Sequence, residues 1–167
     1  MGNTDDNVRA AFAGESQANR KYIFSAEKAE AEGYQQVAKL FRAVADAETV
    51  HARNHLRVLG EVKSTEENLS SAINGEDYEF STMYPSFIKK AEEEGNKKAK
   101  NSFDLANKVE KIHHMLFQSV LSKIKAGQVV EQKPVYVCQV CGYTVEGEAP
   151  ERCPVCGAPV KMFKAIE

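Results

Sequence analysis

Two short stretches of the chain place a glutamate and a histidine three residues apart. AETVH contains Glu48 and His51, and VEKIH contains Glu110 and His113, 62 positions later. Residues three apart share one face of a helix, and around AETVH that face also carries apolar side chains and should be buried. A single pair of this kind is more often solvated or locally paired than metal-binding. Because the pair occurs twice, its spacing favours metal binding over a solvated or locally paired role.

The repetition extends beyond the two motifs. Positions that match between the copies are Phe41 and Phe103, Tyr22 and Tyr84, AEAEG (29–33) and AEEEG (91–95), and, at a spacing of 61, Glu15 and Glu76. The sequence therefore predicts two copies of a helical hairpin. Each copy has a lone glutamate on its first helix and Glu-x-x-His on its second.

The repeat predicts that six polar side chains converge on one central point. Buried carboxylates without cations would not be tolerated in charged form, because desolvation of each costs several kcal/mol. One glutamate from each of two helices and Glu-x-x-His from each of the other two is the di-iron or di-manganese carboxylate arrangement. Oxygen and imidazole ligands suit either metal. The predicted ligands are Glu15, Glu48, His51, Glu76, Glu110 and His113.

The repeat differs at Glu79, where the first copy has Ala18. The four glutamates of the set balance the charge of two Fe(II) ions, whereas two Fe(III) ions sharing a hydroxide need one more negative charge. We therefore hypothesise that one iron is bound by neutral His51 when reduced and by anionic Glu79 when oxidised. The alternative is that Glu79 only accepts hydrogen bonds beside the site.

Tyr22 and Tyr84 occupy equivalent places beside the acids. Their hydroxyl groups are candidates to hydrogen-bond the metal-binding carboxylates. Ordinary aromatic packing is the alternative.

The C-terminal region carries the only cysteines, in CQVCG (138–142) and CPVCG (153–157). Two CxxC pairs predict a tetrahedral site of four sulfurs, for zinc or for a single iron. Gly142 and Gly157 follow the second cysteine of each pair, where glycine permits a tight turn and lets amides approach sulfur. The predicted ligands are Cys138, Cys141, Cys153 and Cys156. Spacing alone does not choose the metal, but a redox-active neighbouring site favours iron over structural zinc.

Four helices must position the acids and histidines, and glycines mark their ends. We predict helices at 4–32, 35–59, 65–94 and 97–125, the third interrupted at Gly75 and bent near Pro85. The fold class is an all-α four-helix bundle followed by a small metal-binding module of strands and loops. The expected divisions are 1–127 for the bundle, 128–134 for a linker and 135–167 for the module.

Composition excludes several kinds of partner. The net charge is −2 with a pI near 6.1, which provides no basic surface for nucleic acid. No apolar run approaches the length of a membrane span, and MGNTDDNVRA lacks the apolar part of a secretory signal. A cytoplasmic protein is expected, with its cysteines binding metal rather than forming disulfides.

These motifs, in this order along essentially the whole chain, resemble the rubrerythrin family: Glu15, AETVH, GEDYE, VEKIH and a rubredoxin-like CxxC pair. The resemblance implies a ferritin-like bundle with two irons, oxo- or hydroxo-bridged when oxidised. It implies that Glu79 joins the six ligands above and that Glu48 and Glu110 bridge the metals. The extra acid Glu79 is itself a feature that distinguishes this family from ferritins.

The resemblance further implies a non-haem di-iron peroxidase that reduces hydrogen peroxide to water in oxidative-stress defence. The candidates for direct roles in that reaction are Glu79, His51, Tyr22 and Tyr84. The resemblance also implies head-to-tail homodimers, in which the rubredoxin-like iron of one subunit feeds the di-iron site of the other. No G-x-G-x-x-G fingerprint is present, so the electron donor is expected to be an external rubredoxin or NAD(P)H-dependent reductase.

Two other functions remain open at this point. One is iron oxidation and storage of the ferritin type, which makes no use of a tethered four-sulfur iron. The other is a non-catalytic module, structural or sensory, stabilised by metal and carrying zinc at its cysteines.

Overall fold

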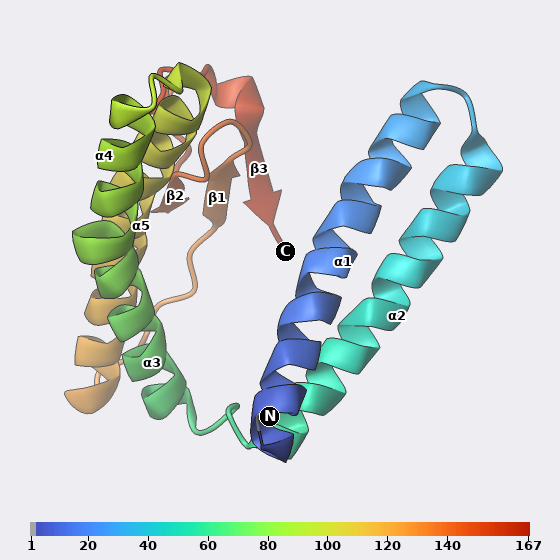
Figure 1. The fold of residues 1–167 in the computed structure, drawn as a ribbon. Coiled ribbons are helices and arrows are strands. Elements are labelled where there is room, and N and C mark those ends of the chain that lie inside the picture. The colour runs from blue at the N-terminus through green and yellow to red at the C-terminus, as the bar shows by residue number, and fades with distance from the viewer. Residues whose placement is uncertain (1–2) are drawn as a thin grey trace. The chain divides into compact units, whose positions relative to one another are not determined.

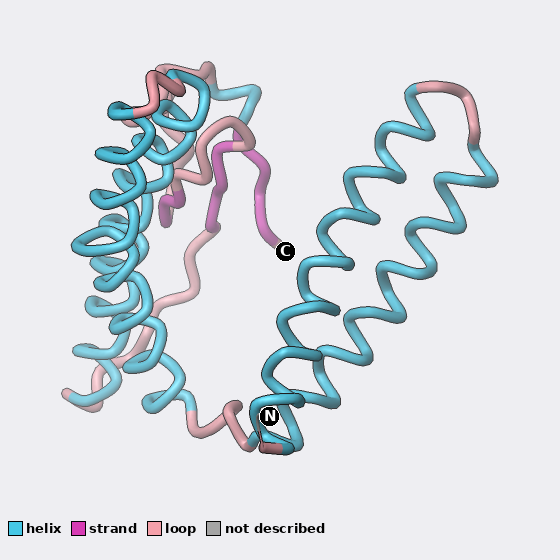
Figure 2. Tube along the Cα trace, viewed as in Figure 1, coloured by secondary structure: helices cyan, strands magenta, loops and turns pink. Residues whose placement is uncertain are grey.

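The computed structural model describes residues 3–167, so the first two residues of the predicted bundle lie outside the described part. The chain divides into two compact units, the first ending at Lys63 and the second running from Ser64 to Glu167. Figure 1 shows the helices and strands, and Figure 2 shows the loops that join them. Among residues 3–167, no helix combines the length and apolar composition of a membrane span.

The first unit is a hairpin of two long helices, α1 (Thr4–Ala31) and α2 (Gln35–Leu59). A capping box between Asn3 and Asp6 satisfies backbone donors at the start of α1. Gly60 ends α2 in the left-handed conformation. The buried residues of the hairpin are all alanines, whose small side chains let the two helices approach closely: Ala26, Ala29, Ala38 and Ala45.

The second unit begins with a second helical hairpin. Ser64 and Glu67 form the predicted capping box at its start. Its helical segments are α3 (Thr65–Tyr78), the π-helix η1 (Glu79–Met83), α4 (Tyr84–Glu93) and α5 (Lys97–Lys125). The four long helices are those predicted from the sequence, the third of them made of α3, η1 and α4 without a break.

The irregularity in this third helix lies at Glu79–Met83, so the predicted interruption at Gly75 is wrong. Gly75 lies inside α3, because a single helical glycine weakens a helix without ending it. In η1 the N–H of Tyr84 reaches the carbonyl of Glu79, five residues back. The next residue, Pro85, has no N–H with which to restore the α-helical pattern at once. The wide turn therefore falls just before the proline.

The repeat explains why a wide turn is needed there. The spacing between the two copies is 61 at Glu15 and Glu76 but 62 at Tyr22 and Tyr84. One residue is thus inserted between Glu76 and Tyr84, and a π-turn absorbs one extra residue within a helix. The insertion keeps both Glu76 and Tyr84 in the places that their counterparts hold in the first hairpin.

Residues 135–167, called the four-cysteine module below, form a small antiparallel sheet with the order β2-β1-β3. Its elements are β1 (Val135–Cys138), β2 (Thr144–Glu146), the 3-10 helix η2 (Val160–Met162) and β3 (Phe163–Ile166). Cys138 and Cys153 are buried at its centre, and Tyr143 packs edge-on against Phe163. Residues 128–134, the predicted linker, contain no helix or strand. The fold class predicted from the sequence is confirmed.

Candidate metal centres

The first hairpin brings together one glutamate from α1 and the Glu-x-x-His pair from α2. The Nδ1 atom of His51 lies 2.9 Å from Glu48 Oε2 and 3.9 Å from Glu15 Oε1. One potential ligand atom from each residue lies within 4.8 Å of the others, which is close enough to share a cation. These three residues are called the first triad below.

The second hairpin repeats this geometry. The Nδ1 atom of His113 lies 2.7 Å from Glu110 Oε2 and 3.9 Å from Glu76 Oε1. Glu76, Glu110 and His113, called the second triad, again have potential ligand atoms within 4.8 Å of one another. The repeat read from the sequence is thus also a repeat of side-chain geometry. Convergence of both triads on one point stays a prediction.

Burial and mutual repulsion perturb the acids of the second triad. Burial, followed by the charge of the neighbouring Glu110 carboxylate and the hydrogen bond to it, raises the pKa of Glu76 to about 7. The Glu110 carboxylate also helps to raise the pKa of His113, through their hydrogen bond. A bound cation would relieve the repulsion between these acids.

Glu79, the first residue of η1, interacts electrostatically with the second triad. Burial raises the pKa of Glu79, and the charge of Glu110 adds to this effect. Burial likewise raises the pKa of Tyr84, followed by the charges of Glu110 and Glu79. Glu79 therefore lies in the electrostatic field of the second triad. Its place among the metal ligands and its exchange with His51 stay predictions.

The two repeated tyrosines pack in equivalent ways. The ring of Tyr22 lies 6.0 Å from that of Phe41, and the ring of Tyr84 lies 6.2 Å from that of Phe103, measured between centroids. Aromatic packing is therefore part of the role of both. Among the described residues, neither hydroxyl has a hydrogen bond to a carboxylate of a triad. Their roles in catalysis stay predictions.

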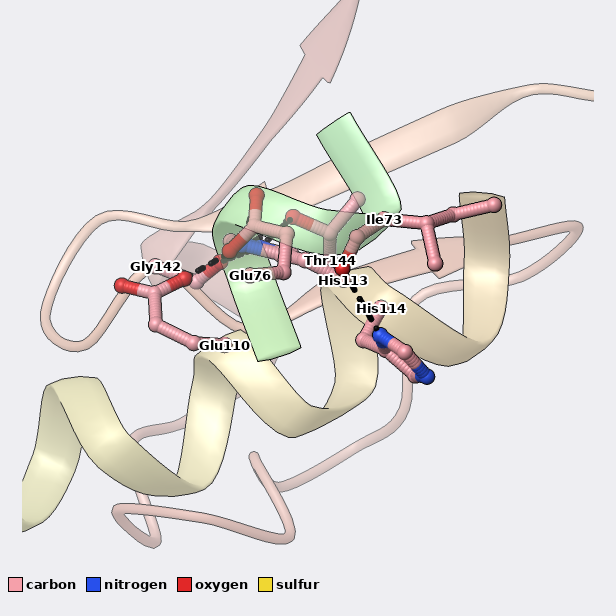
Figure 3. A network of polar contacts seen from close by, with 7 residues as sticks. All are labelled: Ile73, Glu76, Glu110, His113, His114, Gly142 and Thr144. Carbon is pink, nitrogen blue, oxygen red and sulfur yellow. Dashed lines mark hydrogen bonds and ion pairs between the residues drawn. The ribbon is translucent and has the colours of Figure 1, made fainter. Parts of the chain in front are cut away.

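The outward-facing nitrogen of His113 contacts the four-cysteine module (Figure 3). Nε2 lies 3.0 Å from Thr144 Oγ1 and 3.3 Å from the carbonyl oxygen of Gly142. Sequence reasoning did not find Thr144, because no local spacing relates a strand residue of the module to a residue of α5. His51 differs, since among residues 3–167 its Nε2 has no hydrogen-bond partner and 54% of its side chain is exposed.

The adjacent His114 is half-buried and has a hydrogen-bond partner within its own hairpin. Its Nδ1 lies 3.1 Å from the carbonyl oxygen of Ile73, and its ring packs edge-on against Phe80. Figure 3 shows it pointing away from Glu76 and Glu110. Its omission from the predicted ligand set agrees with this geometry.

The four cysteines form a compact cluster of free thiols. The Sγ atoms of Cys138 and Cys156 lie 3.7 Å apart, and those of Cys141 and Cys153 lie 3.5 Å apart. A tetrahedral metal with sulfur bonds of about 2.3 Å holds its ligand sulfurs about 3.8 Å apart. The cluster therefore fits one tetrahedral metal ion.

Backbone geometry at the cysteines supports the same conclusion. Gly142 and Gly157 have φ angles of +85° and +76°, which confirms the tight turns predicted after each CxxC pair. Burial raises the pKa of the Cys141 thiol, and a backbone N–H from Tyr143 partly opposes that rise. Burial would also raise the pKa of Cys153, but N–H groups of Cys156 and Val155 donate to it and the net direction is downward. Amide donors are thus already aimed at sulfur.

Comparison with known proteins agrees with this set of sites. A family model described as rubrerythrin matches residues 6–121, well over half of the chain. The chain belongs to the rubrerythrin family. A second model, described as the rubredoxin-like domain of rubrerythrin, matches residues 136–164.

Individual members of the rubrerythrin family are similar over nearly their full length. Rubrerythrin-2 of Clostridium acetobutylicum is 38% identical, over 98% of this chain and 96% of its own. Nigerythrin of Nitratidesulfovibrio vulgaris is 37% identical, over 99% of this chain and 87% of its own. A solved structure of nigerythrin in a mixed-valence state matches with a TM-score of 0.59 and 38% identity, covering 99% of this chain and 88% of that one.

The rubrerythrin family binds a di-iron centre and a single iron in its rubredoxin-like site. The residues of this chain fit both groups. Together the two triads contain the four glutamates and two histidines that a di-iron carboxylate centre requires, and within each triad imidazole and carboxylate atoms already face one another. The cysteines supply four sulfurs at tetrahedral spacing.

Proposed function

We propose that this protein is an oxidoreductase that reduces hydrogen peroxide to water and takes its electrons through the iron of the four-cysteine module. The observation that carries the proposal is the contact of His113 with Gly142 and Thr144. It joins a carboxylate metal group directly to the loop that follows Cys141. A protein that only stores iron has no need of such a connection.

The proposed reaction consumes one hydrogen peroxide, two electrons and two protons and yields two water molecules. The di-iron group supplies the two electrons and a Lewis acid when it is bound. The residues of the chain hold the other reactants in place. Glu79 and Tyr84 lie in the electrostatic field of Glu110, and the raised pKa of Tyr84 keeps a proton on its hydroxyl oxygen. In the proposed reaction that hydroxyl serves as a hydrogen-bond donor beside the acids.

The local structure at Glu79 and at His51 also bears on the proposed exchange of metal ligands. Glu79 starts a π-helical turn, whose wider ring makes fewer regular hydrogen bonds than an α-helix and often marks functional positions. His51 is the more exposed histidine of the two triads, with no partner on Nε2 among the described residues. We propose that the weakly held His51 is the histidine that Glu79 replaces on oxidation, while His113 stays fixed by its contact with the module.

The proposal includes a homodimer in the cytoplasm and an external electron donor, either a rubredoxin or an NAD(P)H-dependent reductase. Membership of the rubrerythrin family supports the donor class. In a head-to-tail dimer the four-cysteine module of one chain serves the carboxylate site of its partner. The contact between His113 and Thr144 lies within one chain, so it offers a second route for the electron.

Metal analysis combined with an anaerobic peroxide assay tests the function. The iron-loaded protein should show the visible colour of a ferric four-sulfur site, lose it on reduction, and recover it as peroxide is consumed. Cys138→Ser should abolish donor-driven turnover while leaving a chemically reduced di-iron site able to react once. Rapid turnover of O2 with Fe(II), and little with peroxide, would favour the ferritin-like alternative. A colourless zinc protein that consumes no peroxide would favour the structural one.

A further inference from the structure

One peptide group lies between the second triad and the cysteine sulfurs. The carbonyl oxygen of Gly142 faces His113 Nε2 at 3.3 Å and accepts a hydrogen bond from the Thr144 hydroxyl at 3.0 Å. The N–H of the same peptide group belongs to Tyr143 and donates to the Cys141 sulfur. The group therefore receives hydrogen bonds on one side and donates one to a metal ligand on the other.

The direction of these hydrogen bonds follows from the chemistry of the donors. In the metal-free protein His113 Nδ1 donates its proton to the Glu110 carboxylate at 2.7 Å. When Nδ1 binds a cation instead, the proton of the imidazole lies on Nε2, and the directions below are those of this metal-bound state. The Thr144 hydroxyl gives its single proton to the Gly142 carbonyl and accepts from Nε2–H with its lone pair. The chain of donors runs from His113 to Thr144, then to Gly142, and through the peptide group to Cys141.

Hydrogen bonds arranged in such a chain strengthen one another. A cation on Nδ1 withdraws electron density from the imidazole and makes Nε2–H a stronger donor. The carbonyl of Gly142 is then more strongly polarised, and the Tyr143 N–H becomes a better donor to sulfur. Amide donors to sulfur favour the reduced, more negative form of a four-sulfur iron, so its reduction potential rises.

We propose that Thr144 is a positioning residue that couples metal binding at His113 to the reduction potential of the four-sulfur iron. The coupling rests on the proposed function, because it requires metal in both sites. It adds to that function the order of events: the four-sulfur iron is more readily reduced when the carboxylate site is loaded. Protein molecules whose carboxylate site holds metal then accept an electron from the donor in preference to those whose carboxylate site is empty.

A structural role for Thr144 makes a different prediction. The first triad contains no equivalent contact among the described residues, since His51 Nε2 has no partner there. Gly142 lies beside Val109 of α5, since a methyl group added at Gly142 would be 3.7 Å from the valine side chain. If Thr144 served only to hold the module against α5, its loss would loosen the packing at this point. Docking and coupling can therefore be measured separately.

The test uses the full-length protein with iron in the four-cysteine module and the carboxylate sites either metal-free or loaded with redox-inert Zn2+. The reduction potential is followed through the visible absorption of the ferric site. Thr144→Val keeps the shape and strand preference of the side chain but removes the hydroxyl, and Thr144→Ser restores it. Thr65→Val, at the exposed start of α3, is the matched control.

In the native protein and in the Thr144→Ser and Thr65→Val variants, loading with Zn2+ should raise the potential. In Thr144→Val the rise should be smaller, leaving only the part due to the charge of the ion acting through space. Amide hydrogen exchange in β1 and β2 should remain unchanged in this variant, which shows that the module is still docked.

An equal rise in Thr144→Val and the native protein overturns the coupling, as does the absence of any rise in the native protein. A smaller rise accompanied by loss of exchange protection in β1 and β2 also overturns it, because docking alone then explains the effect. A native protein that consumes peroxide but shows no rise keeps the proposed function and loses the coupling. One that shows the rise but consumes no peroxide keeps the coupling and loses the function.

Discussion

Glu76 on α3 and Glu110 on α5 face each other as a hydrogen-bonded pair of acids, and burial together with the charge of Glu110 raises the pKa of Glu76 to about 7. Ionising both carboxylates without a cation between them is unfavourable, so below about pH 7 the pair holds a proton. The pair therefore destabilises the metal-free protein once both acids are ionised, and a bound cation would relieve their repulsion.

The stability of the metal-free protein should fall as the pH rises from about 5 to about 7. The folded-state pKa of Glu76 lies above its ordinary value of 4.5, so in this window the folded protein binds a proton that the unfolded chain has released. Unfolding is then favoured progressively as the proton is lost, and the effect levels off above pH 7. Chemical denaturation of the metal-free protein at a series of pH values measures the free energy of unfolding.

Glu76→Gln should flatten this pH dependence and stabilise the metal-free protein at about pH 8, because the amide cannot ionise. Asp77→Asn, at the exposed neighbouring position, is the matched control and should leave the pH dependence in place. An unchanged profile in Glu76→Gln would show that another group carries the titration.

Removal of the charge of Glu79 should slow peroxide turnover. Glu79→Gln keeps the size of the side chain but removes the fifth negative charge that two ferric ions with a shared hydroxide require. We expect kcat to fall at least about tenfold, in line with losses seen when groups around a metal site are changed. Steady-state kinetics measure kcat, and redox titration should show a higher reduction potential at the di-iron site, since the oxidised state is destabilised.

Crystals of the oxidised and the reduced protein provide the structural check on this prediction. Oxidised crystals should show Glu79 as a ligand, and reduced crystals should show His51 in its place. Iron found at one fixed position with the same side chains in both states would refute the exchange, and Glu79 would then act as a hydrogen-bond acceptor beside the site.

The long helices, the grouping of Glu and His within each hairpin and the cluster of four cysteines could be predicted from the sequence because their determinants are local. Apolar periodicity and terminal glycines placed 35–59 and 97–125 at the observed bounds of α2 and α5. The repeated Glu-x-x-His fixed which residues share a helical face. The π-helix at Glu79 escaped the prediction, although the change in repeat spacing from 61 to 62 between Glu76 and Tyr84 was a signal for it.

The contact between His113 and Thr144 could not be predicted in the same way. It depends on how the four-cysteine module packs against α5, with Gly142 beside Val109, and no periodicity links residues that lie 31 positions apart in different kinds of structure. Tertiary packing, rather than local preference, brings the outward nitrogen of His113 to the hydroxyl of Thr144.

Mixed dimers should reveal whether electrons pass between subunits. Cys138→Ser keeps the carboxylate ligands and lacks the four-sulfur iron. Glu110→Ala keeps the four cysteines and lacks one of the carboxylate ligands. If the homodimer is head-to-tail, mixing the two variants under conditions that exchange subunits should restore donor-driven peroxide reduction above that of either variant alone. Each variant incubated alone is the control. Lack of restoration, with exchange verified by mass, would make the contact between His113 and Thr144 within each chain the working route.

Gly142→Ala should weaken the four-cysteine module. At this position φ is +85°, a backbone conformation that costs a residue with a side chain about 1–2 kcal/mol. Space is not the cause, since the added methyl group would meet Val109 Cγ1 at 3.7 Å, an ordinary contact. Loss of the ferric four-sulfur absorption with increasing denaturant should therefore occur at a lower concentration than in the native protein.

Gly75→Ala is the matched control for that substitution, because the two glycines differ in backbone conformation. Gly75 lies within α3, does not have a positive φ, and has nothing within 4 Å of the position an added methyl group would take. Alanine there should raise the free energy of unfolding of the helical hairpin by about 0.5–1 kcal/mol, as measured by far-ultraviolet circular dichroism. Equal effects of the two substitutions on the four-sulfur absorption would contradict the argument, because only Gly142 combines the left-handed conformation with a carbonyl that accepts from Thr144.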